Sequence, residues 1–431
     1  MKVGVLGLWH LGTVTAACLA ASGHSVTGLD FDETVVADLS AGRPPLFEPG
    51  LEDLVRQGLA AGRLRFTADP AALAEVAVLW VAYDTPVDAD DQADVAYVLE
   101  RVQRALPHLA AGALVLISSQ VPAGTTRRLE PAAAAAGRAL HFAYSPENLR
   151  LGKAIDVFTK PDRVVVGVRA DADADRARVA ELLRPFTDRI EWMAVESAEM
   201  TKHALNAFLA ASVTFINEIA ALCEQAGADA QEVERGLKSE ARIGPKAYLS
   251  PGGPFAGGTL ARDIAFLTQL GAEYQVPTHL LAAVRASNDA HKGWARRRLQ
   301  TLAGPLAGKT IAVWGLTYKP GTDTLRRSAA VELCQWLAGE GARVQAHDPA
   351  VNILPPELAA LIDLRPTALD ALSNAAALVV ATEWPEYRAV PADALTAALA
   401  APAVVIDANR FLARTAGADS RVRYAAVGRP A

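Results

Sequence analysis

The sequence predicts an α/β protein in which two doubly wound parallel sheets are bridged by a long central helix and a helical middle region. Over the first half of the chain, short apolar runs alternate with alanine-rich helical patterns, which is the order that a parallel sheet with crossover helices requires. Residues 196–225 then hold a helical period without any glycine or proline. A second alternation of strands and helices follows, so the long helix is expected to join two sheets.

Each strand is expected where a short run of apolar or β-branched residues lies between helical patterns. In the first sheet these runs are residues 2–6, 25–29, 76–82, 114–118 and 163–168, with helical patterns such as 13–22 and 95–105 between them. In the second sheet the runs are residues 310–315, 343–347, 377–381 and 403–407. The predicted domains are an N-terminal sheet domain at 1–195, a central helical linker and dimerisation domain at 196–302, and a C-terminal sheet domain at 303–431.

Composition and charge exclude several classes of function. The chain has 431 residues, 51% of them hydrophobic, and a formal net charge of −6, so it lacks the basic character of a nucleic-acid-binding protein. Its three cysteines, Cys18, Cys223 and Cys334, lie far apart in apolar helical patterns, which predicts buried reduced thiols and neither disulfides nor a metal site. The chain starts directly with a strand, and no uninterrupted apolar run reaches about 18 residues. We therefore expect a cytoplasmic protein without a signal peptide or a membrane span.

The first expected strand leads into a glycine-containing turn that is typical of Rossmann-like dinucleotide binding. Gly7 would form the tight turn, and Gly12 would let the following helix pack closely on the strand. Free N–H groups at the start of that helix suit a pyrophosphate. Asp30 ends the second strand, where a carboxylate accepts hydrogen bonds from the ribose hydroxyls of NAD and repels the 2′-phosphate of NADP. We expect NAD to contact Asp30 and the turn residues Gly7, Trp9, His10, Leu11 and Gly12.

Trp9 departs from this fingerprint, which has its middle glycine at that position. The glycine lets the backbone approach the pyrophosphate closely. The indole of Trp9 either points away from the cofactor or intrudes on it, and the sequence leaves both alternatives open.

An ordered series of motifs over nearly the whole chain resembles the UDP-glucose/GDP-mannose dehydrogenase family. The first are Leu46-Phe47-Glu48-Pro49-Gly50-Leu51, Val121-Pro122-Ala123-Gly124-Thr125-Thr126, and Ser145-Pro146-Glu147-Asn148-Leu149-Arg150. The middle of the chain adds Lys202 to Asn206, Asn217-Glu218 and Arg242-Ile243-Gly244. The last are Gly315-Leu316-Thr317-Tyr318-Lys319-Pro320-Gly321-Thr322-Asp323 and Thr382-Glu383-Trp384-Pro385-Glu386-Tyr387.

The resemblance implies both the architecture and the chemistry. It implies two Rossmann-like domains bridged by a long helix, a homodimer or larger homo-oligomer, and a nucleotide sugar bound in the cleft. Members of the family oxidise the carbon 6 hydroxyl of a nucleotide-activated hexose to a carboxylate and transfer two hydrides to two NAD molecules. UDP is the default nucleotide, and polysaccharide or natural-product biosynthesis is the expected setting.

The family forms its second oxidation intermediate with a cysteine thiolate, and this chain has no cysteine at the corresponding position. When the family loop G-G-S-C-F-P-K-D is anchored on Asp263, its last seven positions align without a gap on Gly257-Gly258-Thr259-Leu260-Ala261-Arg262-Asp263, which places Thr259 at the nucleophile. A threonine hydroxyl is a poor nucleophile near neutral pH. We expect Thr259 to hydrogen-bond a substrate hydroxyl instead.

Three further positions depart from the family. Gln120 replaces a threonine implicated in ordering the catalytic water, and Leu151 replaces a glutamate associated with hydrolysis. Asp84 stands where the family usually has a glycine, immediately before Thr85-Pro86. The loss of the nucleophile, the water-ordering threonine and the hydrolytic acid predicts that thioester formation and hydrolysis have been dropped.

The residues that a single hydride transfer needs are retained. Glu147, Lys202, Asn206 and Asp263 stand at family active-site positions. The Lys202 ammonium would stabilise an oxyanion on the sugar, and Asn206 would donate to the same oxygen. Asp263 would accept the proton directly or through water. Taken alone, Lys202 could be a surface charge and Asp263 a helix cap for the residues from Ile264 onward.

The resemblance also assigns binding roles elsewhere. Arg242 matches an arginine that reaches the sugar nucleotide across the subunit boundary, and Lys319 and Arg326 match second-domain residues that close over nucleotide and cofactor. The remaining cofactor contacts are expected at Thr85, Pro86, Gln120 and Arg262. Substrate contacts are expected at Glu147, Leu149, Lys202, Asn206, Arg242, Tyr248, Leu249, Gly257 and Lys319.

Three functions are compatible with the sequence. The leading hypothesis is an NAD-dependent nucleotide-sugar oxidoreductase that acts at the carbon 6 hydroxyl and stops after one alcohol–carbonyl step, run forward, in reverse, or transiently as in epimerisation. The second is a full four-electron UDP-glucose 6-dehydrogenase that works through Thr259 or a hydrated aldehyde. The third is a non-catalytic nucleotide-sugar-binding homologue, which Trp9 favours. The sequence fixes neither the sugar nor the nucleotide.

Overall fold

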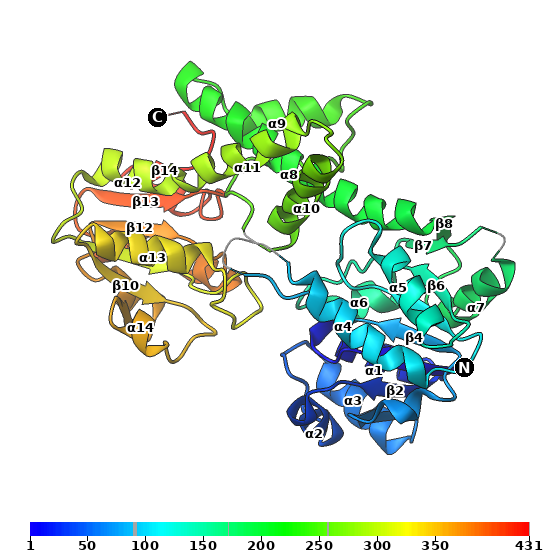
Figure 1. Ribbon diagram of the computed structural model, residues 1–431. Helices are drawn as coiled ribbons and strands as arrows, with labels where there is room; N and C mark the ends of the chain where they lie inside the picture. Colours follow the sequence, from blue (N-terminus) through cyan, green and yellow to red (C-terminus); the bar gives the residue numbers. More distant parts are fainter. Residues whose placement is uncertain (89–92, 171, 257, 431) are drawn as a thin grey trace. The chain divides into compact units, whose positions relative to one another are not determined.

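The computed structural model describes residues 1–88, 93–170, 172–256 and 258–430 and confirms an α/β fold (Figure 1). The chain forms two compact units, Met1–Leu205 and Asn206–Ala431. Each unit contains one sheet of mainly parallel strands. A separate central domain at residues 196–302 stays a prediction.

The first unit contains an eight-stranded sheet with the order β3-β2-β1-β4-β5-β6-β7-β8. All neighbours are parallel except β6 and β7. The strand order reverses between β1 and β4, and ligands of doubly wound sheets bind at such a reversal. The strands are β1 (Lys2–Leu6), β2 (Ser25–Leu29), β3 (Leu64–Thr67), β4 (Val78–Val81), β5 (Leu114–Ile117), β6 (His141–Tyr144), β7 (Val164–Val168) and β8 (Ile190–Ala194).

Helices cover both faces of this sheet, which explains its continuous apolar strands. Side chains of β5 alternate between two cores: Leu114 and Leu116 pack on one face, and Val115 and Ile117 pack on the other. The helices of this unit are α1 (His10–Ala21), α2 (Glu33–Ser40), α3 (Leu51–Ala60), α4 (Val95–Ala105), α5 (Thr125–Ala135), α6 (Ala154–Thr159), α7 (Asp173–Leu183) and the 3-10 helices η1 (Pro70–Leu73) and η2 (Leu106–His108).

The long helix predicted from the sequence is α8, which spans Val195–Ala226 and contains 32 residues. The boundary between the two units falls within it, after Leu205. By length and composition alone it could cross a membrane, and 44% of its most apolar window is buried inside the protein. Its buried polar residues include Glu199, Lys202, His203 and Asn206, a pattern that fits the core helix of a folded domain.

The second unit contains a six-stranded, fully parallel sheet with the order β11-β10-β9-β12-β13-β14. Its order reverses between β9 and β12, as in the first sheet. The strands are β9 (Thr310–Trp314), β10 (Arg343–His347), β11 (Ile362–Leu364), β12 (Ala377–Val380), β13 (Ala403–Asp407) and β14 (Val422–Ala425). The helices are α9 (Ala230–Ser239), α10 (Thr259–Glu273), α11 (His279–Lys292), α12 (Trp294–Ala303), α13 (Ala329–Gly339), α14 (Pro356–Ala359), α15 (Ala368–Leu372), α16 (Ala392–Ala398), η3 (Pro385–Ala389) and η4 (Ala416–Ala418).

Candidate functional site

The turn between β1 and α1 requires both of the glycines that the sequence singled out. Gly7 has φ +91°, and a Cβ at this position would lie 2.7 Å from the ring of Tyr83. A Cβ at Gly12 would lie 1.6 Å from the carbonyl oxygen of Gly7. Only glycine permits this close approach, so the turn brings the start of α1 directly against the end of β1.

Asp30 lies beside this turn at the end of β2. Its carboxylate accepts hydrogen bonds from the N–H of Leu8 at 2.7 Å and from the N–H of Asp32 at 3.1 Å. An ionised carboxylate has about four acceptor positions, so Asp30 can still accept from a ribose hydroxyl. The narrow glycine turn, the helix N-terminus and this acid together fit a dinucleotide such as NAD.

The second sheet also has an aspartate at the end of its second strand, but protein donors occupy that carboxylate. Asp348, at the end of β10, accepts at one oxygen from the N–H groups of Leu316 and Thr317 at 2.7 and 2.9 Å. The same oxygen also accepts from the Thr317 hydroxyl at 3.1 Å and from the Trp384 indole at 3.0 Å. Protein donors, the Trp384 indole among them, therefore saturate this oxygen of Asp348. In the first sheet, Asp30 keeps acceptor positions for a ligand.

The predicted turn residues Trp9, His10 and Leu11 point in different directions. Trp9 precedes α1 and is 48% exposed. The ring of His10 pairs with the buried carboxylate of Glu48 at 2.9 Å, and Glu48 also accepts from the N–H groups at the start of α6. His10 is thereby tied to the protein interior through its side chain. The N–H of Leu11 faces the carboxylate of Asp84 at 3.4 Å.

Helix α8 holds the loop that follows β5. The fully buried carboxylate of Glu199 accepts from the N–H of Gly124 at 2.5 Å and from the N–H and hydroxyl of Thr126 at 2.9 and 2.6 Å. The ring of His203 bonds the carbonyl of Val121 at 2.9 Å. In the same region the hydroxyl of Thr85 donates to the carbonyl of Gln120 at 2.7 Å. Glu199 and His203 were not among the predicted site residues, although charged or polar residues on the apolar face of a helix are a usable signal.

Lys202, one turn along α8, holds the segment after β6. Its ammonium donates to the carbonyl of Glu147 and, at 3.3 Å, to the side-chain oxygen of Asn148. The Glu147 carboxylate accepts from the N–H of Leu149. Lys202 is only 8% exposed, which argues against the alternative of a surface charge.

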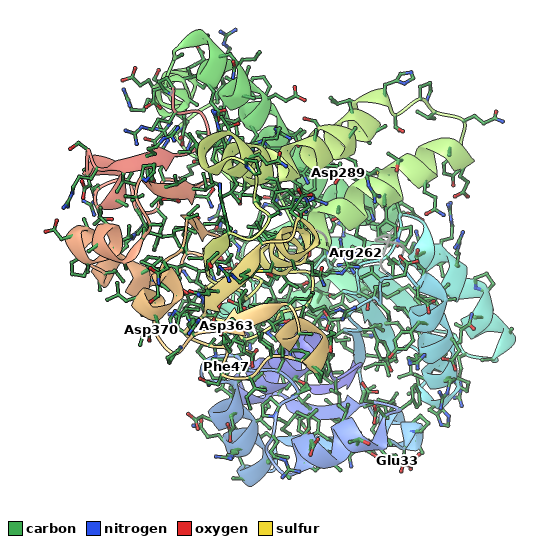
Figure 2. The ribbon with its side chains drawn as sticks, turned by 90° about the vertical axis from the view of Figure 1, so that its left-hand side faces the viewer. Glu33, Phe47, Arg262, Asp289, Asp363 and Asp370 are labelled. Atoms are coloured by element: carbon green, nitrogen blue, oxygen red, sulfur yellow. The ribbon has the colours of Figure 1, made fainter. Side chains whose placement is uncertain are left out.

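Asn206 donates a hydrogen bond to the carboxylate of Asp263, and the two side chains are 5% and 0% exposed. Asp263 lies inside α10, which begins at Thr259 with Gly258 as its N-cap. The alternative that Asp263 caps a helix is therefore wrong. Thr259 is exposed and lies one helical turn before Asp263 (i, i+4), and Arg262 is on the same helix (Figure 2).

Two side chains of α11 and one from the segment after β13 hold the loop that leads to Thr259. Asn288 bonds both the N–H and the carbonyl of Phe255 at 3.0 Å, and His291 bonds the carbonyl of Gly252 at 2.8 Å. Asn409 accepts from the N–H of Gly253 at 2.7 Å and donates to Glu383. The Thr382–Tyr387 motif thereby supports this loop through a relay of side chains. The predicted substrate residue Gly257 lies outside the described residues.

The other predicted substrate and cofactor residues differ widely in their exposure to solvent. Arg242 has a side chain that is 88% exposed and pairs with Glu240 at 2.9 Å. Tyr248 is 58% exposed, whereas Leu249 is buried. Arg326 is exposed and Lys319 is half-buried. Pro86 and Gln120 are also half-buried.

All three cysteines lie in hydrophobic cores. Cys18 on α1 is 1% exposed, Cys223 on α8 is 6% exposed, and Cys334 on α13 is fully buried. Burial raises the pKa of the Cys18 and Cys334 thiols to about 12. None of the three is presented as a nucleophile, because a reactive cysteine needs an exposed thiolate.

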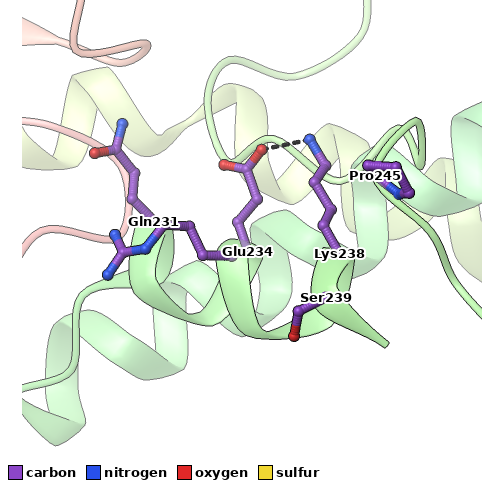
Figure 3. Close-up of a pocket in the computed structure, with 6 residues that line it drawn as sticks. Gln231, Glu234, Lys238, Ser239 and Pro245 are labelled. Atoms are coloured by element: carbon purple, nitrogen blue, oxygen red, sulfur yellow. Dashed lines mark hydrogen bonds and ion pairs between the residues drawn. The ribbon is translucent and has the colours of Figure 1, made fainter. Parts of the chain in front are cut away.

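A surface pocket in the second unit is lined by none of the predicted site residues. It has a volume of about 450 Å³ and is lined by Gln231, Glu234, Arg235, Lys238, Ser239 and Pro245 (Figure 3). Glu234 and Lys238 form an ion pair at 2.6 Å across it.

Three family models match the chain in order. They describe the NAD-binding domain, the central domain and the UDP-binding domain of the UDP-glucose/GDP-mannose dehydrogenase family, and they match residues 1–187, 196–290 and 312–414.

Individual relatives align over the full length. A UDP-glucose 6-dehydrogenase of Rhizobium meliloti is 35% identical over 438 residues and covers 100% of both chains. One of Bacillus subtilis is 32% identical and covers 100% of this chain and 98% of its own. The solved structure of a UDP-glucose dehydrogenase from Pyrobaculum islandicum is similar with a TM-score of 0.87 and 30% identity, and the alignment covers 99% of this chain and 98% of that one.

Proposed function

This chain belongs to the UDP-glucose/GDP-mannose dehydrogenase family of NAD-dependent nucleotide-sugar oxidoreductases, and we propose that it oxidises the carbon 6 hydroxyl of a UDP-hexose in a single two-electron step. The observation that carries this proposal is the absence of any cysteine placed for covalent catalysis. Thr259 starts α10, and the chain's three thiols are buried in cores. Without a thiolate, the aldehyde is not captured for a second oxidation.

The retained side chains fit the first oxidation. The buried ammonium of Lys202 would stabilise the negative charge that develops on the carbon 6 oxygen, and Asn206 would donate to the same oxygen. Asp263, oriented by Asn206, would accept the hydroxyl proton directly or through water. Bound NAD supplies the hydride acceptor. The Glu147 carbonyl and the Asn148 side chain hold the Lys202 ammonium in one position.

The test is the stoichiometry and the product. Purified protein is incubated with NAD and a panel of UDP-, GDP- and TDP-sugars, and NADH formation is followed by absorbance while mass spectrometry identifies the product. One NADH per sugar and an aldehyde or its hydrate support the proposal. Two NADH per sugar and a uronic acid contradict it.

The full four-electron oxidation is the second candidate, because full-length relatives at 35% and 32% identity are UDP-glucose 6-dehydrogenases. In this chain it would proceed through the hydrated aldehyde, which can lose a second hydride without a covalent adduct. The same product analysis separates the two candidates.

We also propose that α8 forms a homodimer interface. Phe208, Phe215 and Leu222 are spaced by seven residues and are 71%, 49% and 65% exposed. Such a spacing lines side chains along one side of a helix, as in paired helices. Light scattering coupled to gel filtration should give a dimer for the natural chain and a monomer for Phe208→Glu with Phe215→Glu.

A further inference from the structure

The carboxylate of Asp84 lies at the N-terminus of α1, where the free N–H groups of the dinucleotide turn are found. The first turn of α1 contains no acidic residue, and Trp9 makes no side-chain cap. The N–H of Leu11, the second residue of the helix, has no partner within the helix. Instead it faces Oδ2 of Asp84 at 3.4 Å. Asp84 comes three residues after the end of β4, the strand that pairs with β1.

This position is the one that a pyrophosphate needs. In dinucleotide-binding folds, the N–H groups and the positive end of the helix dipole at this turn bind the pyrophosphate. Leu11 is buried while Asp84 is exposed, so the carboxylate approaches this N–H from the solvent side. A second negative charge brought within about 4–6 Å is repelled by it.

We propose that Asp84 competes with the pyrophosphate of NAD for the N-terminus of α1 and thereby lowers the affinity for the cofactor. The N–H of Leu11 must exchange Asp84 for the pyrophosphate when NAD binds, and the displaced carboxylate remains close to two phosphate charges. As a consequence, the cofactor dissociates readily from the protein. This property suits a dehydrogenase that exchanges NADH for NAD after each turnover, and it opposes a reaction that recycles a permanently bound NAD.

Calorimetric titration measures this effect without relying on activity. NAD, ADP and adenosine are titrated into the natural protein and into Asp84→Asn and Asp84→Gly. We expect NAD and ADP to bind about tenfold more tightly to both variants, because one repulsive charge has been removed. Adenosine carries no pyrophosphate and should bind all three proteins equally. The gain for NAD should shrink at high salt, since screening weakens the repulsion.

Glu75→Gln is the matched control, since it removes one exposed carboxylate of the same unit that pairs with Lys2 at the opposite end of β1. It should leave NAD affinity unchanged. The proposal is overturned if both Asp84 variants bind NAD no more tightly than the natural protein, or if adenosine gains as much as NAD. Thermal unfolding establishes that each variant is folded. If one Asp84 variant does not fold, the other is sufficient for the comparison.

Discussion

Asn206 donates its side-chain hydrogen bond to Asp263, joining the long helix α8 to the helix that begins at Thr259. Both side chains are buried, so the amide helps to orient a carboxylate that has little access to water. A buried carboxylate held in one orientation is a suitable proton acceptor, because no reorganisation is needed when the proton transfers.

Replacing Asn206 with alanine should therefore impair catalysis strongly. The substitution removes both the donor to Asp263 and the proposed donor to the reacting oxygen, and we expect kcat to fall about 100-fold or more. Steady-state kinetics of NADH formation measure the change. Ser212→Ala on the same helix is the control, because its hydroxyl only donates to the carbonyl of Phe208 within α8. Equal losses in the two variants would contradict a catalytic role for Asn206.

A cysteine in place of Thr259 should form a covalent adduct with the aldehyde, but the thioester that follows should not be hydrolysed. A thiol at the start of α10 would have its pKa lowered by the helix N-terminus. The thiolate would attack the aldehyde, and the adduct would give a hydride to a second NAD and leave a thioester. The resemblance implies that Gln120 and Leu151 stand at the family's water-ordering and hydrolytic positions, so we expect the thioester to persist.

The measurements for Thr259→Cys are a rapid burst of NADH and the mass of the intact protein, which should increase by one bound sugar nucleotide. Thr259→Ser is the matched control and should form no such species. A Thr259→Cys protein that behaves like the natural one would show that position 259 does not lie near the oxidised carbon.

Glu199 should be one of the most sensitive stability positions in the chain. Its carboxylate is fully buried and accepts three hydrogen bonds from Gly124 and Thr126 at the start of α5. In Glu199→Gln an amide NH2 faces N–H donors, and we expect a loss of about 2–4 kcal/mol, as for a disrupted buried charged hydrogen-bond network. Chemical denaturation measures it.

Glu196 provides the comparison for Glu199, because it lies one turn earlier on α8 and is partly exposed in its ion pair with Arg169. Glu196→Gln should cost no more than about 1 kcal/mol, as is usual for exposed ion pairs. Similar losses at Glu196 and Glu199 would refute the special role of the buried cap.

His291 should make the protein less stable in mild acid. Burial lowers its pKa below 6.5, the value expected in the unfolded chain. As the pH falls through 6.5, the unfolded chain therefore binds the proton first, and stability is lost towards the lower folded pKa. Above 6.5 the contribution is fully present. His291→Gln should lose less stability between pH 7.5 and 5.5, by at most about 1.4 kcal/mol per pH unit. The exposed His279→Gln is the control, and thermal unfolding across this range gives the comparison.

Several strands were predicted from the sequence with their observed ends, including β1, β2, β10 and β13. β1, β2 and β13 are parallel strands buried at all but their first residue or throughout, as strands covered on both faces require, whereas β10 is buried only at alternate residues. The prediction missed β3, β6, β8, β11 and β14, which have three to five residues. The outermost of these strands pair on one side only, so their sequences include exposed polar residues and resemble loops.

The candidate site likewise contains residues that local sequence could identify and contacts that it could not. Local sequence was sufficient to identify Gly7 and Gly12, because the shape of one turn excludes a Cβ. The assignment of position 259 to the nucleophile stays a prediction. Contacts between residues far apart in sequence could not be derived. Glu199 caps a helix that begins 74 residues earlier, and Asp84 meets a turn 73 residues before it.

The sequence by itself determined the two doubly wound sheets, the long helix and the dinucleotide turn, because each depends on residues that are neighbours along the chain. Only the tertiary structure decided that Lys202 is held by the carbonyl of Glu147, that Asn206 is held by the buried carboxylate of Asp263, and that Asp84 faces the start of α1. Burial and hydrogen-bond partners arise when distant segments pack together, and local periodicity contains no information about which segments will meet.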